Sequence, residues 1–284
     1  MAVESALENR KTINTGRLAA HLLLLVTSFI FIFPFIYIIF TAFKTEMDTL
    51  QNPSLLYFNF TFENFKAITA SGVRIIAYYK NSIILTVVST LFVIILSSAG
   101  GYGFAKYRFR TRKLIMTTIL LTMTFPLGAL LIPMYIMEFK LGFSDTLIGL
   151  IIPNIAVNVP FGFFIMQAVF KAMPNEIIDY AEIDGCGPFK TWYLIMVPIA
   201  KNGILATGIL CFRSVWGEFT IARTLASSVR SLPLSVGLTE LKGEFWHFGI
   251  MSAIILMAIL PPVIIFIIFR NYFQRGIAVG SVKG

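Results

Sequence analysis

The feature that most constrains this chain is a series of long stretches without a charged residue. Between His21 and Lys44 lie 22 such residues, and residues 81–105, 114–137, 146–170 and 248–269 form four more uncharged stretches. A helix rises about 1.5 Å per residue, so roughly 20 apolar residues cross a hydrocarbon core of about 30 Å. We therefore expect five membrane-spanning helices in these segments.

Residues 202–222 predict a sixth span, although Arg213 and Glu218 interrupt its apolar sequence. The composition agrees with a membrane protein, because 57% of the residues are hydrophobic and only 13% are charged, against about 25% in ordinary globular proteins. The first stretch is longer than the apolar core of a cleaved signal peptide, so we expect it to be retained. The predicted fold class is an all-α integral membrane protein with six transmembrane helices.

The cations predict how these spans are oriented. Cytoplasmic loops of membrane proteins are rich in Lys and Arg, and the short segment after the second span holds five cations and no acid: Lys106, Arg108, Arg110, Arg112 and Lys113. We therefore expect both termini in the cytoplasm. This distribution also accounts for the net charge of +9 without nucleic acid, since no soluble module carries a basic patch interleaved with aromatics.

Several kinds of chemistry are excluded by what the chain lacks. Its two cysteines, Cys186 and Cys211, have no CxxC spacing, and two histidines do not make a metal cluster. No phosphate-binding GxxxxGK[ST] loop occurs. The sequence shows no arrangement of a nucleophile with a general base, so it does not indicate an enzyme. We expect no catalytic residue, no metal and no cofactor on this chain.

A long acidic segment lies between the span expected at residues 146–170 and the one expected at residues 202–222. Pro174 suits the first turn of a helix, and Gly185 suits a left-handed cap at its end. A second amphipathic stretch begins after Pro188, and Pro198 is expected to stop it. By periodicity alone, the favoured interpretation is an interfacial hairpin that only joins two spans.

The same residues resemble a known motif. Residues 174–198, PNEIIDYAEIDGCGPFKTWYLIMVP, are similar to the EAA motif of ABC importer permeases. The matching positions are Asp179 for Glu, Tyr180 and Ala181 for the two alanines, Ile183, Asp184 and Gly185 for I-D-G, and Ile195 with Pro198 at the end. Further similarities reach from about residue 61 to 284 and include FENFKAI, GGYGFAKYRFRTRK, WGEF, LPLSVGL and the ending FRNYFQRGIAVGSVKG. They are closest to the carbohydrate branch, of the maltose-permease type.

The resemblance implies a type I ABC importer permease fold in a bacterial inner membrane. Residues 1–80 would hold the cytoplasmic N-terminus, the first helix and an external segment. Residues 81–270 would form the core with five helices and a coupling loop at 174–200, called the coupling segment below, and residues 271–284 a cytoplasmic tail. The implied partners are a second permease, two cytoplasmic ATPase subunits that bind ATP and Mg, and an external solute-binding protein. The implied substrate is a sugar or oligosaccharide, moved by alternating access.

The motif also implies which residues meet the ATPases. In the coupling segment these are Glu176, Asp179, Ala181, Glu182, Asp184, Gly185 and Pro198. In the tail they are Gly280, Lys283 and Gly284. For an external partner, the two long external segments, 44–80 and 223–247, are expected to form small folded caps.

Polar residues within the spans indicate a candidate substrate path. Asn154 and Asn158 lie four residues apart, hence on one helix face, and hydrogen bonding to neighbouring helices competes with sugar contact as their role. Arg213 is expected near mid-membrane, facing a partner permease or cavity water. Glu218 would lie about 140° around the same helix, so each is expected to have its own partner.

Two alternative functions remain open at this point. An ABC permease for another small solute, such as an amino acid or a metal ion, would show the same motif. A secondary carrier would need its own ion or proton relay, and one Arg with one Glu in a single span offers little for that.

Overall fold

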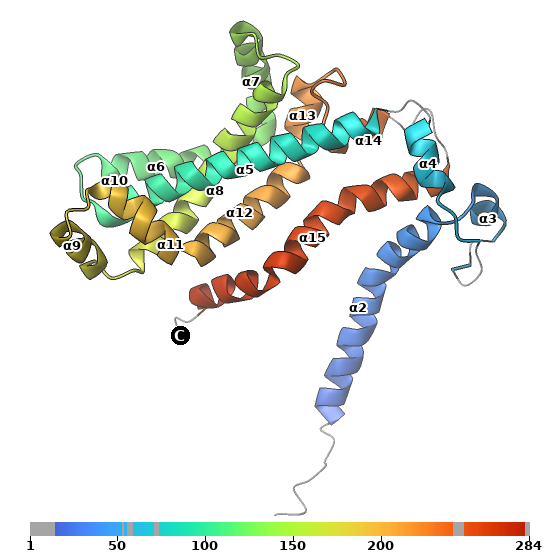
Figure 1. Cartoon of the computed structure of the whole chain (residues 1–284), viewed down its shortest axis with the longest axis horizontal. Coiled ribbons are helices and arrows are strands. Elements are labelled where there is room, and N and C mark those ends of the chain that lie inside the picture. Colours follow the sequence, from blue (N-terminus) through green and yellow to red (C-terminus); the bar gives the residue numbers. More distant parts are fainter. Residues whose placement is uncertain (1–14, 53, 56–58, 71–73, 241–246, 282–284) are drawn as a thin grey trace, which may run out of the picture. The chain divides into compact units, whose positions relative to one another are not determined.

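The computed structural model describes residues 15–52, 54–55, 59–70, 74–240 and 247–281. In this part of the chain all regular secondary structure is helical (Figure 1). The chain forms two compact units, one comprising Met1–Ala70 with Phe245–Met257, the other Ser71–Glu244 with Ala258–Gly284. Each is described by itself.

The first unit contains α2 (Thr15–Ala42), α3 (Glu46–Gln51), α4 (Glu63–Ala70) and the beginning of α15 (Phe248–Ser281). The apolar side chains of α2 from Leu18 to Phe35 are exposed, so this span keeps its surface for lipid or another chain.

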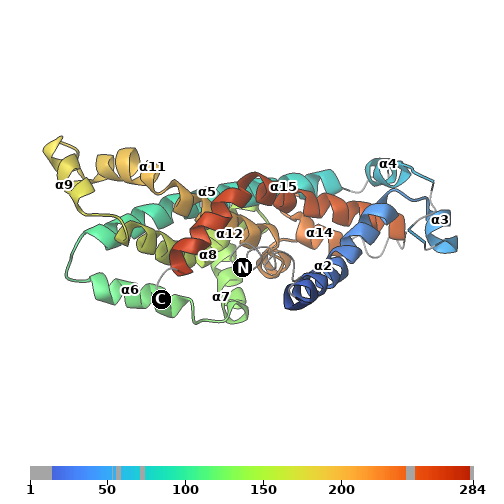
Figure 2. The ribbon, with the colours of Figure 1, turned by 90° about the horizontal axis from the view of Figure 1, so that it is seen from below.

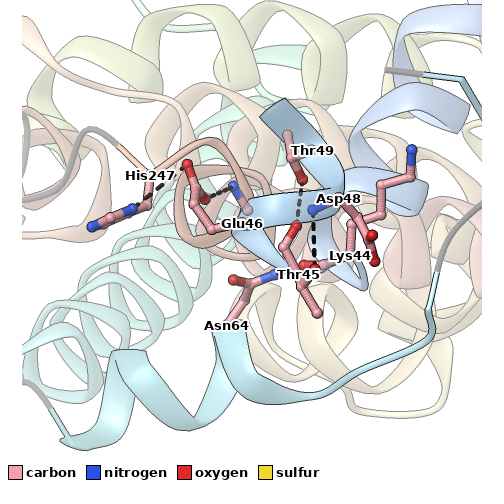
Figure 3. A network of polar contacts seen from close by, with 8 residues as sticks. Lys44, Thr45, Glu46, Asp48, Thr49, Asn64 and His247 are labelled. Carbon is pink, nitrogen blue, oxygen red and sulfur yellow. Dashed lines mark hydrogen bonds and ion pairs between the residues drawn. The ribbon is translucent and has the colours of Figure 1, made fainter. Parts of the chain in front are cut away.

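Buried polar contacts hold the segment that follows α2 (Figure 3). The Lys44 side chain is 2% exposed, and its Nζ donates to the carbonyl oxygens of Asn52 and Ser54. From α4, Asn64 Nδ2 donates to the carbonyl oxygens of Ala42 and Lys44 at 2.9 and 2.7 Å. Lys44, expected as an external surface cation, is therefore an internal residue that closes the loop.

The second unit contains eleven elements among the described residues. They are α5 (Ile75–Lys106), α6 (Arg112–Thr122), α7 (Leu127–Leu141), α8 (Leu147–Lys171), α9 (Glu176–Ile183), α10 (Pro188–Lys190), the π-helix η1 (Thr191–Met196), α11 (Val197–Ile199), α12 (Lys201–Trp216), α13 (Thr220–Leu225) and α14 (Leu234–Glu240), followed by the remainder of α15. Helices α5 and α8 pack along each other, with α12 against both (Figure 1). Figure 2 shows α6, α9 and α11 toward the same end of this unit.

Small residues allow the central helices to approach closely. A Cβ added to Gly101 of α5 would lie 2.7 Å from the backbone nitrogen of Gln167 in α8. A Cβ on Gly162 of α8 would lie 2.5 Å from the Oγ of Ser97. Van der Waals packing drives helix association in lipid, and small residues such as these glycines allow the helices to come close enough to pack.

Among the described residues, four helices are long and apolar enough to cross a membrane: Leu18–Ala42, Ile75–Lys106, Leu147–Lys171 and Phe248–Arg270. Two bent helix pairs raise the number to as many as six. The single helix expected over residues 114–137 is wrong, because α6 and α7 meet at 99° (Figure 1). Pro126 precedes α7, has no N–H for a helix hydrogen bond and disfavours helical geometry in the residue before it.

The other expected boundaries also shift. The span expected at 202–222 is α12, which ends at Trp216 and meets the preceding helical segment, Pro188–Ile199, at 82°. A separate tail was expected from residue 271, but α15 continues to Ser281. Gly280 lies in its last turn, whereas Lys283 and Gly284 lie outside the described residues.

Candidate functional site

The coupling segment is anchored through one apolar face. Ile178 of α9 and Met196 of η1 are buried in a cluster with Tyr102 of α5 and with Met166 and Phe170 of α8. Burying aliphatic and aromatic side chains is worth about 1.5–3 kcal/mol each, which holds the segment against the ends of α5 and α8.

The turn inside the coupling segment has a defined geometry. The α9 helix ends at Ile183, and Gly185 follows with φ +74°, as expected for a left-handed cap. The N–H of Gly185 donates to the carbonyl of Glu182, and the N–H of Cys186 donates to that of Ala181. These two bonds form a Schellman motif, in which glycine carries the positive φ without strain. The predicted helix and cap are confirmed, with the helix beginning at Glu176 instead of Pro174.

The outer face of the segment is left exposed. Ile183 is 81% exposed, Phe189 70% and Tyr180 68%, and the acidic residues predicted for the ATPase contact lie among them: Glu176, Asp179, Glu182 and Asp184. Gly185 and Pro198 are exposed too, whereas Ala181 is buried against the core. Tyr180, which replaces a small residue of the motif, points away from the packed side. The outer face therefore combines apolar surface with negative charge.

Pro198 does not stop the second helix as expected. Helical structure continues from Pro188 to Ile199, one residue past the proline, and the π-helix η1 ends at Met196, two residues before it. A proline lacks the N–H donor and crowds the preceding turn, and a wider π turn accommodates both effects.

Lys106, one of the five cations that predict the orientation, also positions the coupling segment. Lys106, at the end of α5, donates from Nζ to the Met173 carbonyl at 2.5 Å and to Asn175 Oδ1 at 2.9 Å. It ties α5 to the residues just before α9. This role depends on which residues the fold brings together, so the sequence held no signal for it.

The amides predicted for the substrate path bond within their own helix. Asn154 is 1% exposed, and its Nδ2 donates to the Leu150 carbonyl, while Nδ2 of the half-buried Asn158 donates to the Asn154 carbonyl. Of the two roles considered for these amides, hydrogen bonding to neighbouring helices is not seen among the described residues. Asn158 is thus the more accessible of the two amides.

Arg213 and Glu218 do not share a helix. Arg213 is exposed in the last turn of α12, where the helix dipole favours a cation, and not at the middle of a long span. Glu218 follows that helix and accepts from the backbone N–H groups of Ile221 and Ala222 at the start of α13, at 2.6 and 2.9 Å. Glu218 is therefore a helix cap, and the prediction of separate partners is confirmed for it.

The opposite end of this unit holds a polar clamp that the sequence did not indicate. Asp145 Oδ1 accepts from the N–H groups of Ser227 and Ser228 and from Ser231 Oγ. Asn81 Nδ2 donates to the carbonyls of Val229 and Leu232. Together they fix residues 226–232, called the clamped turn below.

The charge of Asp145 is favoured where it lies. Burial by itself raises the pKa of this carboxyl, but the hydrogen bonds from Ser231 and from the backbone of Ser227 and Ser228 outweigh it and hold the pKa below its usual range. Hydrogen bonds to the charged form act in this direction.

A separate polar contact lies in the first unit (Figure 3). The Nδ1 of His247 lies 3.5 Å from Glu46 Oε1, and the N–H of Gly249 donates to Glu46 Oε2. These contacts join the residues after α2 to the start of α15. Of the two segments expected to form caps, residues 44–80 contain α3, α4 and the first residues of α5, and residues 223–247 contain α14.

Comparison with known proteins places this architecture. The family described as binding-protein-dependent transport system inner membrane component matches residues 93–279. The probable ABC transporter permease protein y4oR of Sinorhizobium fredii is 32% identical over 98% of this chain and 100% of its own length. The arabinooligosaccharides transport system permease protein AraQ of Bacillus subtilis is 28% identical over 94% and 96%. A crystal structure of a bacterial ABC transporter that imports the acidic polysaccharide alginate matches with a TM-score of 0.81 at 23% identity, over 93% of this chain and 98% of that chain.

The chain therefore belongs to the family of inner membrane components of binding-protein-dependent transport systems. It is a multi-pass inner-membrane permease subunit of an ABC transporter, with the type I importer fold. In this family the permease is not catalytic, and ATP hydrolysis belongs to separate subunits. The expected fold class and protein class are confirmed.

Proposed function

We propose that this permease moves a sugar or oligosaccharide by alternating access between two sides of a bacterial inner membrane. Among similar proteins, AraQ is named for arabinooligosaccharides, and the solved transporter imports alginate. The assembly would contain a second permease, two ATPase subunits that hold ATP and Mg, and an external solute-binding protein. This chain itself would hold no cofactor.

The observation that carries the proposal is the two-faced coupling segment. Its inner face is buried against the ends of α5 and α8, and its outer face presents exposed apolar and acidic side chains. A surface of this kind suits docking into a groove on another protein, because apolar anchors supply affinity and charges supply orientation. The docked residues would include Asp179, Glu182, Asp184 and Gly185.

The chain offers a matched pair of glycines to test this role. Gly185 has φ +74° and Gly142, which caps α7, has φ +72°, and a Cβ at either would meet nothing within 4 Å. Gly185→Trp and Gly142→Trp therefore impose similar backbone strain, and at both positions the added Cβ lies in open space. We expect Gly185→Trp to abolish substrate-stimulated ATP hydrolysis in the reconstituted transporter, and Gly142→Trp to leave it near the native rate.

Two outcomes would contradict the coupling role. If both variants hydrolyse ATP normally, the segment is only a connector. If both lose activity and expression to the same extent, the effect is one of folding. The charge reversal Asp184→Lys gives a second test, because Asp184 is exposed and its loss should not affect insertion.

We also propose that both termini and the coupling segment face the cytoplasm. Lys106 and the other cations of residues 106–113 lie toward the same end as α9, as the bonds from Lys106 to Met173 and Asn175 require. In a Cys186→Ser background, Thr111→Cys should react with a membrane-impermeant maleimide only from the cytoplasm. Leu141→Cys, at the exposed last residue of α7, should react only from outside. The reverse pattern would overturn the orientation.

The substrate path and the tail complete the proposal. Exposed Arg213 and half-buried Asn158 and Glu218 are the path candidates more accessible to solute, whereas Asn154 is buried. The tail residues Gly280, Lys283 and Gly284 would reach the ATPases, so deleting residues 279–284 should lower coupled hydrolysis. A sugar that raises the melting temperature of the cognate external binding protein and is imported would identify the substrate class. If only amino acids or metal ions do so, the alternative solute is correct.

A further inference from the structure

A cavity of about 540 Å³ lies beside the loop that connects α5 to α6. One side is lined by cations from the loop and the first turn of α6: Arg108, Arg110, Arg112 and Lys113. The other side is lined by the apolar side chains of Met116, Leu120 and Phe164, with Phe109 at the loop. The cavity therefore has a cationic part and an apolar part.

The four cations that line the cavity differ from neighbouring Lys106, the last residue of α5, in having no polar partner among the described residues. Lys106 is engaged by the Met173 carbonyl and the Asn175 side chain. The side chains of the other four make no hydrogen bond or ion pair with any described residue. Four uncompensated positive charges around one cavity repel one another, so an anion bound there would be favoured.

The walls of the cavity are held in place by packing. Phe109 packs edge-on against Phe104 of α5 at 4.9 Å between ring centroids, and Phe104 packs against Phe163 of α8 at 5.1 Å. On the other side, Gln167 of α8 donates to the Met116 sulfur of α6. The cationic loop is thus fastened to both α5 and α8, which gives the cavity a defined shape.

We propose that this cavity binds one anionic phospholipid, with its phosphate among Arg108, Arg110, Arg112 and Lys113 and its acyl chains along α6 and α8. The arrangement matches such a molecule, because an Arg fork binds phosphate oxygens bidentately and basic pockets between transmembrane helices bind anionic headgroups. A free phosphate would use only the cationic wall. The apolar residues Met116, Leu120 and Phe164 favour an amphiphile.

The lipid would fasten the loop that directly follows Lys106, whose side chain contacts the residues just before the α9 helix of the coupling segment. Its placement in the cytoplasmic leaflet rests on the orientation proposed above. The binding itself does not depend on that orientation or on transport, so its test can fail or succeed independently of the proposed function.

Native mass spectrometry of the detergent-purified transporter would measure the binding. Dioleoylphosphatidylglycerol and dioleoylphosphatidylcholine would be added separately to the native complex and to Arg110→Gln/Arg112→Gln. The matched control is Lys171→Gln/Lys201→Gln, which removes two exposed cations that do not line the cavity. Each cation near an anionic surface contributes about fivefold in affinity, so we expect the arginine pair to weaken phosphatidylglycerol binding roughly 30-fold and the lysine pair to change it little.

Two further measurements distinguish binding of a lipid from binding of another ligand. Thr117→Trp keeps every charge but fills the cavity from α6, and it should also abolish retention of the lipid. Added inorganic phosphate should fail to displace the lipid if the acyl chains contribute. Equal binding of both phospholipids, equal loss in the two double variants, or complete displacement by phosphate would each overturn the proposal.

Discussion

The two ends of the second unit hold their connecting segments by opposite means. The coupling segment is attached by apolar side chains on one face, and its turn at Gly185 has open space around it. The clamped turn is fixed by hydrogen bonds to polar side chains, from partly buried Asp145 on one side and buried Asn81 on the other. Just beyond it, Gly237 of α14 lies so close to Tyr78 that an added Cβ would be 2.2 Å from the ring.

This difference indicates how a permease can combine a rigid end with a docking end. Hydrogen bonds to a carboxylate and an amide require particular geometry, so they select one conformation of the clamped turn. Apolar packing on one face anchors the coupling segment yet leaves its other face available to a partner. The following substitutions test that contrast.

Gly237→Ala should have the largest effect on stability. The new Cβ would clash with Cδ2 and Cγ of Tyr78, which lie near the base of the ring and move only if Tyr78 changes its χ1 rotamer or α5 moves. Overpacking of this kind costs about 2–3 kcal/mol, although alanine otherwise favours a helix. Equilibrium unfolding of the detergent-solubilised chain would measure the loss. Tyr78→Ala in the same chain should recover part of it, and additive losses would show that the clash is not the cause.

Asp145→Ala should have the next largest effect. It leaves two backbone N–H groups and the Ser231 hydroxyl without their acceptor, and hydrogen bonds to a charged group contribute about 1.5–3 kcal/mol. We expect a loss near the lower value, because the site is only partly buried. Asp145→Asn keeps one acceptor oxygen and tolerates the positive φ of 58°, so it should lose less. Equal losses for the two variants would argue against the clamp.

The Asp145 clamp also predicts a pH dependence. Its pKa is lower in the folded chain than in the unfolded chain, so the folded state binds the proton less readily. The stabilisation should be complete well above the unfolded value of about 3.9 and should be lost as the pH falls toward the lowered pKa. Unfolding measured from pH 6 to pH 3 should show this loss in the native chain and not in Asp145→Ala.

Gly185→Ala should have the smallest effect. No neighbouring atom lies within 4 Å of the added Cβ, so the cost is the positive φ alone, about 1 kcal/mol. Gly187→Ala is the matched control, because its surroundings are equally open and its φ is −71°. Gly187→Ala should leave stability nearly unchanged. A loss at Gly185 as large as that at Gly237 would mean that the turn is packed and not open.

Much of the fold followed from local sequence. Uncharged stretches long enough to cross a membrane predicted the spans at α2, α5, α8 and α15, because a helix satisfies all its backbone hydrogen bonds within one segment in lipid. The α9 helix and its Gly185 cap were predicted for a similar reason: helix ends depend on a few neighbouring residues. The acids of the coupling segment were recognised because they belong to one contiguous motif.

Tertiary structure decided what depends on residues far apart in the chain. The stretch expected as one helix over residues 114–137 bends before α7, and the one expected over residues 202–222 ends as α12 at Trp216. Asp145 binds residues more than 80 positions away, and Lys106 reaches Met173. Sequence determined which segments enter the membrane, because hydrophobicity and length are local quantities. Only the fold determined which buried charges and amides find partners, because each hydrogen bond needs two groups that packing alone brings together.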